Sequence, residues 1–148
     1  MSDNRPHITV AAIVERDGRF LVVEENTIDG VRLNQPAGHL EADESLADAC
    51  VRETLEETAH HVSGNSLVGI YQWARPDGGI QYLRFVFACS DHGEETGRTL
   101  DEGIIRAQWF SYEDLQAQQD RLRSPLVMQC IEDYVDGRRF PLYLIRQL

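Results

Sequence analysis

Hydrophobic and polar residues alternate in five short segments of the chain, and one longer segment between them follows a different pattern. Alternation with a period of two predicts half-buried β-strands. The segments that show it are 7–15, 19–25, 67–73, 81–89 and 107–110. Asp17-Gly18 separates the first two segments, which predicts a two-residue hairpin turn. Residues 44–59 contain no glycine or proline and consist mostly of helix formers, so we expect an α-helix there.

Two further helix starts lie in the C-terminal third of the chain. Ser111 precedes the acidic residues of one short helix, and Ser124-Pro125 combines an N-cap serine with a proline at the first helical position. Gly137 is the expected end of that last helix. The order of strands, helix, strands and helix predicts an α/β fold, a mixed β-sheet between helices on both faces. Because no repeat or linker interrupts residues 1–148, we expect a single domain.

The composition is that of a globular domain. Hydrophobic residues make up 42% of the chain, which excludes a disordered or low-complexity polypeptide. No apolar run approaches the roughly 18 residues of a membrane span, and the polar start lacks the apolar core of a signal peptide. The three cysteines form no CxxC pair, which excludes a cysteine zinc site and a disulfide framework. We therefore expect a cytoplasmic protein without a membrane partner.

An excess of acidic residues limits the kind of ligand. The chain carries 25 Asp and Glu against 14 Lys and Arg, a formal net charge of −11. Binding of a nucleic acid polymer is disfavoured, because such surfaces need an excess of Lys and Arg. A small anionic substrate stays compatible with this charge if metal ions bridge it to carboxylates. The five histidines show no zinc-binding spacing, and the pair His60-His61 predicts a surface turn.

Three carboxylates gather on one side of the predicted helix 44–59. Glu53, Glu56 and Glu57 fall within a 100° arc, since residues three and four apart are helical neighbours. Such glutamates repel each other by about a few tenths of a kcal/mol per pair, and a hard divalent cation such as Mg²⁺ offsets that repulsion. The opposite arc, expected to pack on the sheet, consists of Ala47, Val51, Thr54, Leu55 and Thr58.

Glutamate-rich helix faces are usually just solvated, so the rest of the segment decides between solvation and metal binding. Gly38 stands fifteen residues before Glu53, where we expect it to open a turn whose backbone carbonyl points at the same metal. Arg52 follows Asp48 and precedes Glu56 by four residues each, so its guanidinium can neutralise and orient the carboxylates.

This spacing resembles the box of the Nudix hydrolase family, G-x5-E-x7-R-E-U-x-E-E-x-G-U, where U is an aliphatic residue. From its first to its last glycine position the box covers residues 38–59 here, and the aliphatic position that follows falls on residue 60. Its departures are Thr54 and His60 in place of aliphatic residues and Ala59 in place of glycine, and none removes a metal ligand. The matching residues are Gly38, Glu44, Arg52, Glu53, Glu56 and Glu57.

The similarity to one group of that family, the NudJ-type phosphatases, extends over nearly the whole chain. It implies a small Mg²⁺-dependent enzyme that releases phosphate from nucleoside tri- and diphosphates and from hydroxymethylpyrimidine pyrophosphate. It also implies attack at the terminal phosphorus, with the base held loosely and little discrimination between bases. The segments that carry the similarity are 20–25, 34–41, 72–73, 83–85, 122–127 and 137–142.

The resemblance implies roles for individual residues. Metal ligands are Glu53, Glu56 and Glu57 with the Gly38 carbonyl, and Mn²⁺ can substitute for Mg²⁺. Arg52 orients the cluster and Glu44 is an auxiliary ligand. The general base is one of the box glutamates or, as second choice, Asp101 or Glu102. Apart from the resemblance, Trp73 can stack on a base, and Arg123 and Arg138 belong to the densest basic cluster of an acidic chain. With Arg84 they are the candidate substrate-binding residues.

Two other functions stay open at this point. A Nudix-type sensor would hold a nucleotide without cleaving it, but such sensors commonly lose box glutamates, and this chain keeps all three. A pyrophosphatase that cuts nucleotide-sugars or dinucleotides at an internal phosphate often carries an added domain, for which this chain has no room. A monomer or a weak homodimer is expected.

Overall fold

The structure is a computed structural model, and it describes residues 4–148 of the chain. Its strands and helices follow the predicted order, with additional short strands and 3-10 turns. The strands are β1 His7–Arg16, β2 Arg19–Thr27, β3 Gly30–Asn34, β4 Ala37–His39, β5 His60–Ala74, β6 Gln81–Glu94 and β7 Ile104–Ser111. The helices are α1 Leu46–Thr58, α2 Tyr112–Gln116, η1 Gln119–Arg121, α3 Leu126–Val135 and η2 Leu142–Leu144.

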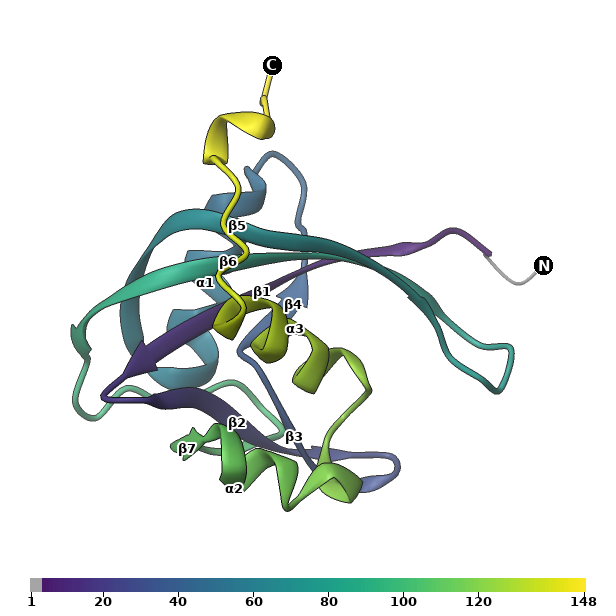
Figure 1. The fold of residues 1–148 in the computed structure, drawn as a ribbon, viewed down its shortest axis with the longest axis vertical. Helices are drawn as coiled ribbons and strands as arrows, with labels where there is room; N and C mark the ends of the chain where they lie inside the picture. Colours follow the sequence, from purple (N-terminus) through teal and green to yellow (C-terminus); the bar gives the residue numbers. More distant parts are fainter. Residues whose placement is uncertain (1–3) are drawn as a thin grey trace.

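The strands form a mixed sheet in the order β3-β2-β1-β6-β5. β1 and β6 run parallel over His7 to Val14, whereas the other strand pairs of the described residues are antiparallel. The short β4 also pairs with β1, and β7 pairs with β2. Figure 1 shows β5 and β6 as long curved strands whose hairpin protrudes at the right, with β2, β3 and β7 at the bottom of the view.

Both faces of this sheet are buried, as the α/β prediction requires. Along β1, Ala11 and Ile13 face a core that includes residues of α2 and α3, whereas Val10, Ala12 and Val14 face a core that includes residues of α1. All five are at most 2% exposed. Alternate residues of β1 therefore enter two separate hydrophobic cores, and helices cover both faces of the sheet (Figure 1).

The predicted surface turn at His60 is wrong. Strand β5 begins at His60 directly after α1, because Ala59 adopts a left-handed conformation with φ of 63° and reverses the chain. The His60 ring is buried, its Nδ1 lies 3.0 Å from Asp91, and its edge packs on Trp109. β5 and β6 are accordingly longer than the alternating segments indicate.

Capping follows the sequence signals closely. Ser111 and Asp114 form a capping box at the start of α2. α3 begins at Leu126, one residue later than expected, with Pro125 at its N-cap; the Ser124 hydroxyl oxygen accepts a hydrogen bond from the Leu126 amide. Gly137 follows the helix with φ of 86°. Across the described part of the chain, no helix has the length and apolar character that crossing a membrane requires.

Candidate active site

Helix α1 is held at both ends by local interactions. The Ser45 hydroxyl oxygen caps its N-terminus by accepting a hydrogen bond from the Asp48 amide, so the helix starts at Leu46, two residues later than expected. At its C-terminus the Ala59 amide donates to the Leu55 carbonyl. The left-handed Ala59 costs about 1 kcal/mol relative to glycine at that position, a stability cost that leaves the carboxylates of the helix in place.

Arg52 connects the acidic residues around the start of α1. Two of its nitrogens donate to the two carboxylate oxygens of Glu44, at 3.0 and 2.7 Å. The third donates to Glu53 at 2.9 Å and to Glu56 at 3.2 Å. A further bond to the His39 carbonyl reaches β4. Hydrogen bonding to Arg52 lowers the pKa of Glu44. Arg52 therefore joins Glu44, Glu53 and Glu56 in one hydrogen-bonded arrangement.

A loop carboxylate completes the acidic cluster. Carboxylate oxygens of Glu53, Glu56 and Asp101 lie within 4.8 Å of one another. The Asp101 amide donates to the Glu56 carbonyl, which fixes the loop on α1. Burial raises the pKa of Glu53, with further contributions from Glu56 and Asp101 and an opposing one from Arg52. The neighbouring Glu102 is exposed and does not belong to this cluster.

Glu57 is more buried than Glu53 and Glu56, the two other glutamates of the same arc of α1. Its side chain is buried and accepts a hydrogen bond from the Ala37 amide at 2.8 Å. Burial raises its pKa to about 8, and the charges of Glu25, Glu53 and Asp101 add to the rise. The helical arc was correct, but the sheet edge approaches this side of α1 and covers Glu57.

Gly38 does not open a turn as predicted. It lies in the middle of β4 and pairs with Val10 of β1. A β-carbon at this position would lie 2.1 Å from the carboxylate carbon of Glu53 and 2.3 Å from each of its oxygens. Only glycine allows this approach, so the backbone of β4 and the acidic cluster are in direct contact.

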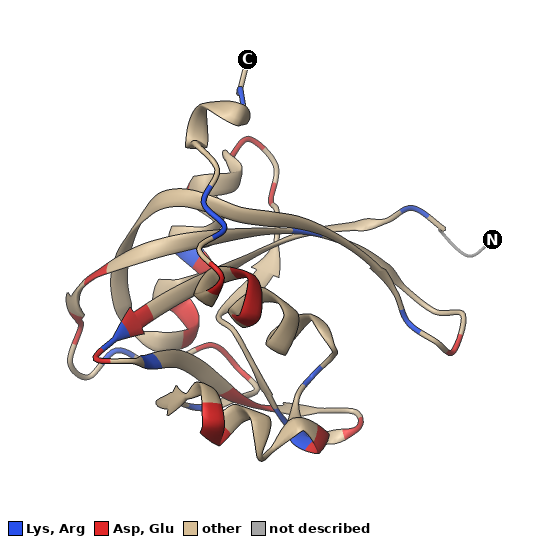
Figure 2. Cartoon of the chain, in the orientation of Figure 1, with Lys and Arg blue, Asp and Glu red and all other residues tan. Residues whose placement is uncertain are grey.

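The donor set of this cluster fits a hard divalent cation. Carboxylate oxygens from α1 and the Asp101 loop converge, and burial already raises the pKa of Glu53, so a cation would relieve the repulsion between them. Acidic residues also lie on α2 and α3, away from this cluster (Figure 2). Convergence of the oxygens, and not acidity alone, distinguishes this site.

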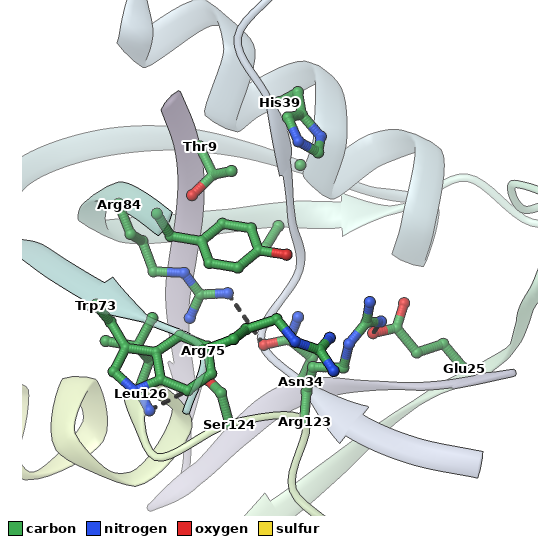
Figure 3. Close-up of a pocket in the computed structure, with 13 residues that line it drawn as sticks. Thr9, Glu25, Asn34, His39, Trp73, Arg75, Arg84, Arg123, Ser124 and Leu126 are labelled. Atoms are coloured by element: carbon green, nitrogen blue, oxygen red, sulfur yellow. Dashed lines mark hydrogen bonds and ion pairs between the residues drawn. The ribbon is translucent and has the colours of Figure 1, made fainter. Parts of the chain in front are cut away.

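A pocket of about 220 Å³ borders β4, and its lining includes Gly38, the residue in contact with Glu53 of the acidic cluster. Three of the four predicted substrate-binding residues, Trp73, Arg84 and Arg123, line it (Figure 3). The Trp73 and Tyr82 rings stack with centroids 6.0 Å apart and planes 17° apart. The other lining residues are Thr9, Glu25, Asn34, Ala37, Gly38, His39, Arg75, Tyr82, Ser124 and Leu126.

The two predicted arginines of this pocket differ in their surroundings. Arg84 is 6% exposed, and its nitrogens donate to the side-chain oxygens of Gln35 and Asn34, both at 3.1 Å. Arg123 is more exposed and donates to Glu25 at 2.6 Å. Figure 3 shows the dashed bond between Arg84 and Asn34 at the centre of the view and the Arg123–Glu25 pair at one side.

Arg138, the fourth predicted substrate-binding residue, does not line the pocket. It follows α3, its amide donates to the Asp133 carbonyl, and its guanidinium lies 3.6 Å from the Asp133 carboxylate. Conversely, sequence reasoning missed Asn34, Arg75 and His39 as lining residues. Asn34 and His39 lie in segment 34–41, which carries part of the family resemblance, so that resemblance was a signal that could have indicated them. Arg75 lies outside the segments that carry the resemblance.

The comparisons with known proteins agree with this geometry. The NUDIX domain profile matches residues 4–129. A protein named phosphatase NudJ from Escherichia coli K12 is 44% identical over 142 residues, which is 95% of this chain and 91% of the relative. A solved Nudix hydrolase from Nitrosomonas europaea is 48% identical, with a TM-score of 0.94 over 97% of this chain and 98% of that one.

More distant structures share the fold alone. A MutT Nudix hydrolase from Burkholderia pseudomallei superimposes with a TM-score of 0.74 at 20% identity, over 87% of this chain and 98% of that one. The matched region includes the whole box, with its glutamates, Arg52 and Gly38 assembled around α1. This chain belongs to the Nudix family and is a Nudix hydrolase, an enzyme of the class that acts on pyrophosphates.

Proposed function

We propose that this enzyme hydrolyses phosphoanhydride bonds of small organic pyrophosphates in a metal-dependent reaction that releases phosphate. Nucleoside tri- and diphosphates are the proposed main substrates, with hydroxymethylpyrimidine pyrophosphate as a further one. The observation that carries the proposal is the convergence of Glu53, Glu56 and Asp101 next to a pocket lined by three arginines. The E. coli relative of 44% identity is named a phosphatase, which supports release of phosphate.

Glu53, Glu56 and Asp101 would hold Mg²⁺, or Mn²⁺ as a substitute, because their oxygens already converge. Two further candidate ligands adjoin these oxygens. One is the Gly38 carbonyl, because β4 contacts Glu53, and the other is Glu57, which lies on the same helix. A bound ion would neutralise phosphoryl oxygens and act as a Lewis acid. Arg52 keeps Glu44, Glu53 and Glu56 in one arrangement through its hydrogen bonds.

The protein itself supplies a proton acceptor for the attacking water. A box glutamate is the proposed general base, and Asp101 is the alternative. Glu102, the other residue named from the sequence, has no geometric support, since it lies outside the cluster.

Substrate binding uses the pocket. Arg123 is accessible from solvent and pairs with Glu25, so a phosphate group can replace the carboxylate as its partner. Trp73 lines the same pocket, with its ring stacked on that of Tyr82. Arg138 has no place in this account, because its described contacts lie at the end of α3. We further propose that the enzyme is cytoplasmic and acts as a monomer or weak homodimer.

An activity panel tests the proposal. Nucleoside triphosphates, nucleoside diphosphates, a nucleotide-sugar and a dinucleotide are incubated with Mg²⁺, and orthophosphate and pyrophosphate are measured separately. We expect orthophosphate from tri- and diphosphates. Cleavage confined to nucleotide-sugars or dinucleotides would favour the internal pyrophosphatase, and nucleotide binding without any hydrolysis would favour the sensor.

A further inference from the structure

Backbone groups on the free edge of β4 bind side chains of α1. β4 pairs with β1 along one edge. Because the amide and carbonyl groups of successive residues point to opposite edges of a strand, those of residues 37 and 39 share the other edge. There the Ala37 amide donates to the Glu57 carboxylate at 2.8 Å, and the His39 carbonyl accepts from Arg52 at 3.1 Å. Two residues of α1 are therefore held by hydrogen bonds to this edge.

Gly38 brings the same strand against a third residue of α1. Its backbone lies so close to the Glu53 carboxylate that there is no room for a β-carbon. Residues 37–39 therefore each contact one residue of α1, in the order Glu57, Glu53 and Arg52. Since Arg52 also donates to Glu53 and Glu56, a shift of β4 would disturb the whole acidic cluster.

Gln35 anchors the chain just before β4. β4 is only three residues long, so its pairing with β1 gives it few hydrogen bonds of its own. The Gln35 side chain is 1% exposed. Its Oε1 accepts a hydrogen bond from Arg84 of β6 at 3.1 Å, and its Nε2 donates to the Val127 carbonyl of α3 at 2.7 Å. Gln35 therefore fixes the chain at the start of β4 to two other elements of the fold.

The two partners of Gln35 require a neutral amide. A guanidinium can only donate hydrogen bonds, and a backbone carbonyl can only accept them. The Gln35 amide supplies one acceptor and one donor, which match both partners. A glutamate would face the Val127 carbonyl with a second oxygen, and a methionine would leave both buried partners unpaired. Because unpaired buried polar groups are costly, either change favours a shift of the chain at residue 35.

We infer that Gln35 is a positioning residue for the metal site: its buried amide fixes β4, and β4 in turn places Glu53, Glu57 and Arg52. Gln35 neither lines the pocket nor belongs to the acidic cluster, so it acts through the backbone of residues 36–39. Loss of a group that orients metal-binding residues typically weakens metal affinity by about tenfold to a hundredfold. The inference rests on the proposed function, because it concerns the divalent cation that this function requires.

Gln35→Met tests the inference, because methionine keeps the length of the side chain and loses both hydrogen bonds. Calorimetric titration with Mn²⁺, well below the Tm of each protein, measures metal binding without catalysis. We expect the Kd for Mn²⁺ to rise by about tenfold or more. The Mn²⁺ concentration that gives half-maximal activity should rise in parallel, whereas KM for the nucleotide at saturating Mn²⁺ should change by less than about threefold. A role in stability alone would lower Tm and change neither metal quantity.

Gln129→Met is the matched control, since it removes a glutamine hydrogen bond to Asp133 within α3 and leaves β4 unchanged. Its Kd for Mn²⁺ should stay within about twofold of the wild type. Gln35→Glu is a second variant, which keeps an acceptor for Arg84 and should also weaken Mn²⁺ binding. Gln35 variants that bind Mn²⁺ as the wild type does, or that fail to fold, would overturn the inference and assign Gln35 to stability. A wild type that binds no Mn²⁺, with or without nucleotide, would overturn the proposed function itself.

Discussion

Gly38 and Glu53 are in such close contact that a β-carbon on residue 38 would lie 2.1 Å from the Glu53 carboxylate carbon. We therefore predict that Gly38→Ala displaces Glu53 from the cluster with Glu56 and Asp101. Activity should fall by about a hundredfold or more, because one carboxylate leaves a shared site. Steady-state kinetics with saturating Mg²⁺ measures this loss.

Gly64→Ala is a matched control on β5. A β-carbon there would meet its nearest atom, on Phe87, at an ordinary distance of 3.7 Å. Activity of this variant should stay within about twofold of the wild type, since the nearest atom to the added β-carbon is an ordinary contact outside the acidic cluster. If Gly38→Ala retained activity as well, the contact between β4 and Glu53 would have no role in catalysis.

Asp101→Asn and Glu102→Gln separate the two loop carboxylates. Asp101 shares the cluster with Glu53 and Glu56, whereas Glu102 lies outside it. We predict that Asp101→Asn lowers kcat by at least about tenfold, and that Glu102→Gln changes it by less than about twofold. Equal effects of the two substitutions, measured under the same metal concentration, would contradict the placement of Asp101 in the site.

Glu57→Gln tests the cost of burying the Glu57 carboxylate. The folded pKa of about 8 lies above the ordinary value of 4.5, so the charged group destabilises the folded protein as pH rises from about 4.5 to 8. Glutamine keeps an oxygen for the Ala37 amide and carries no charge. Without metal, the variant should match the wild type at pH 4 and be more stable by about 1–3 kcal/mol at pH 8. Urea unfolding at several pH values measures this difference, and a pH-independent difference would contradict the shifted pKa.

Divalent cations should stabilise the folded protein. An ion that binds only the folded cluster adds about 2.7 kcal/mol at a hundredfold excess over its Kd. We predict a rise in Tm with millimolar Mg²⁺ or Mn²⁺, and a much smaller rise for Glu53→Gln, which removes one carboxylate of the cluster. Thermal unfolding of both proteins, scanned with and without each ion, makes the comparison. An equal rise in both would show that the ions bind elsewhere.

The sequence predicted the parts of the site that depend on local spacing. Glu53 and Glu56 share one side of α1 because residues three apart are neighbours on any helix. Arg52 reaches both for the same reason, and its bonds to Glu44 and to the His39 carbonyl agree with the predicted orienting role. The mixed sheet and its two helical layers followed from the order of elements in the same way.

Contacts between distant segments could not be predicted from spacing. Glu57 is buried because β4 and its preceding residues approach α1, and Asp101 joins the cluster because its loop is bonded to the Glu56 carbonyl. His60 is buried because Ala59 reverses the chain at once into β5. Arg138 was grouped with Arg123 by charge, although α3 separates the two residues in the fold.

The position of bond cleavage tests the central claim most directly. GTP is hydrolysed with Mg²⁺ in ¹⁸O-labelled water, and the products are analysed by mass spectrometry. Attack at the terminal phosphorus predicts GDP and orthophosphate, with the heavy oxygen in orthophosphate, followed by cleavage of GDP to GMP. Pyrophosphate as the dominant product, or heavy oxygen in the nucleotide, would contradict the proposed phosphatase reaction.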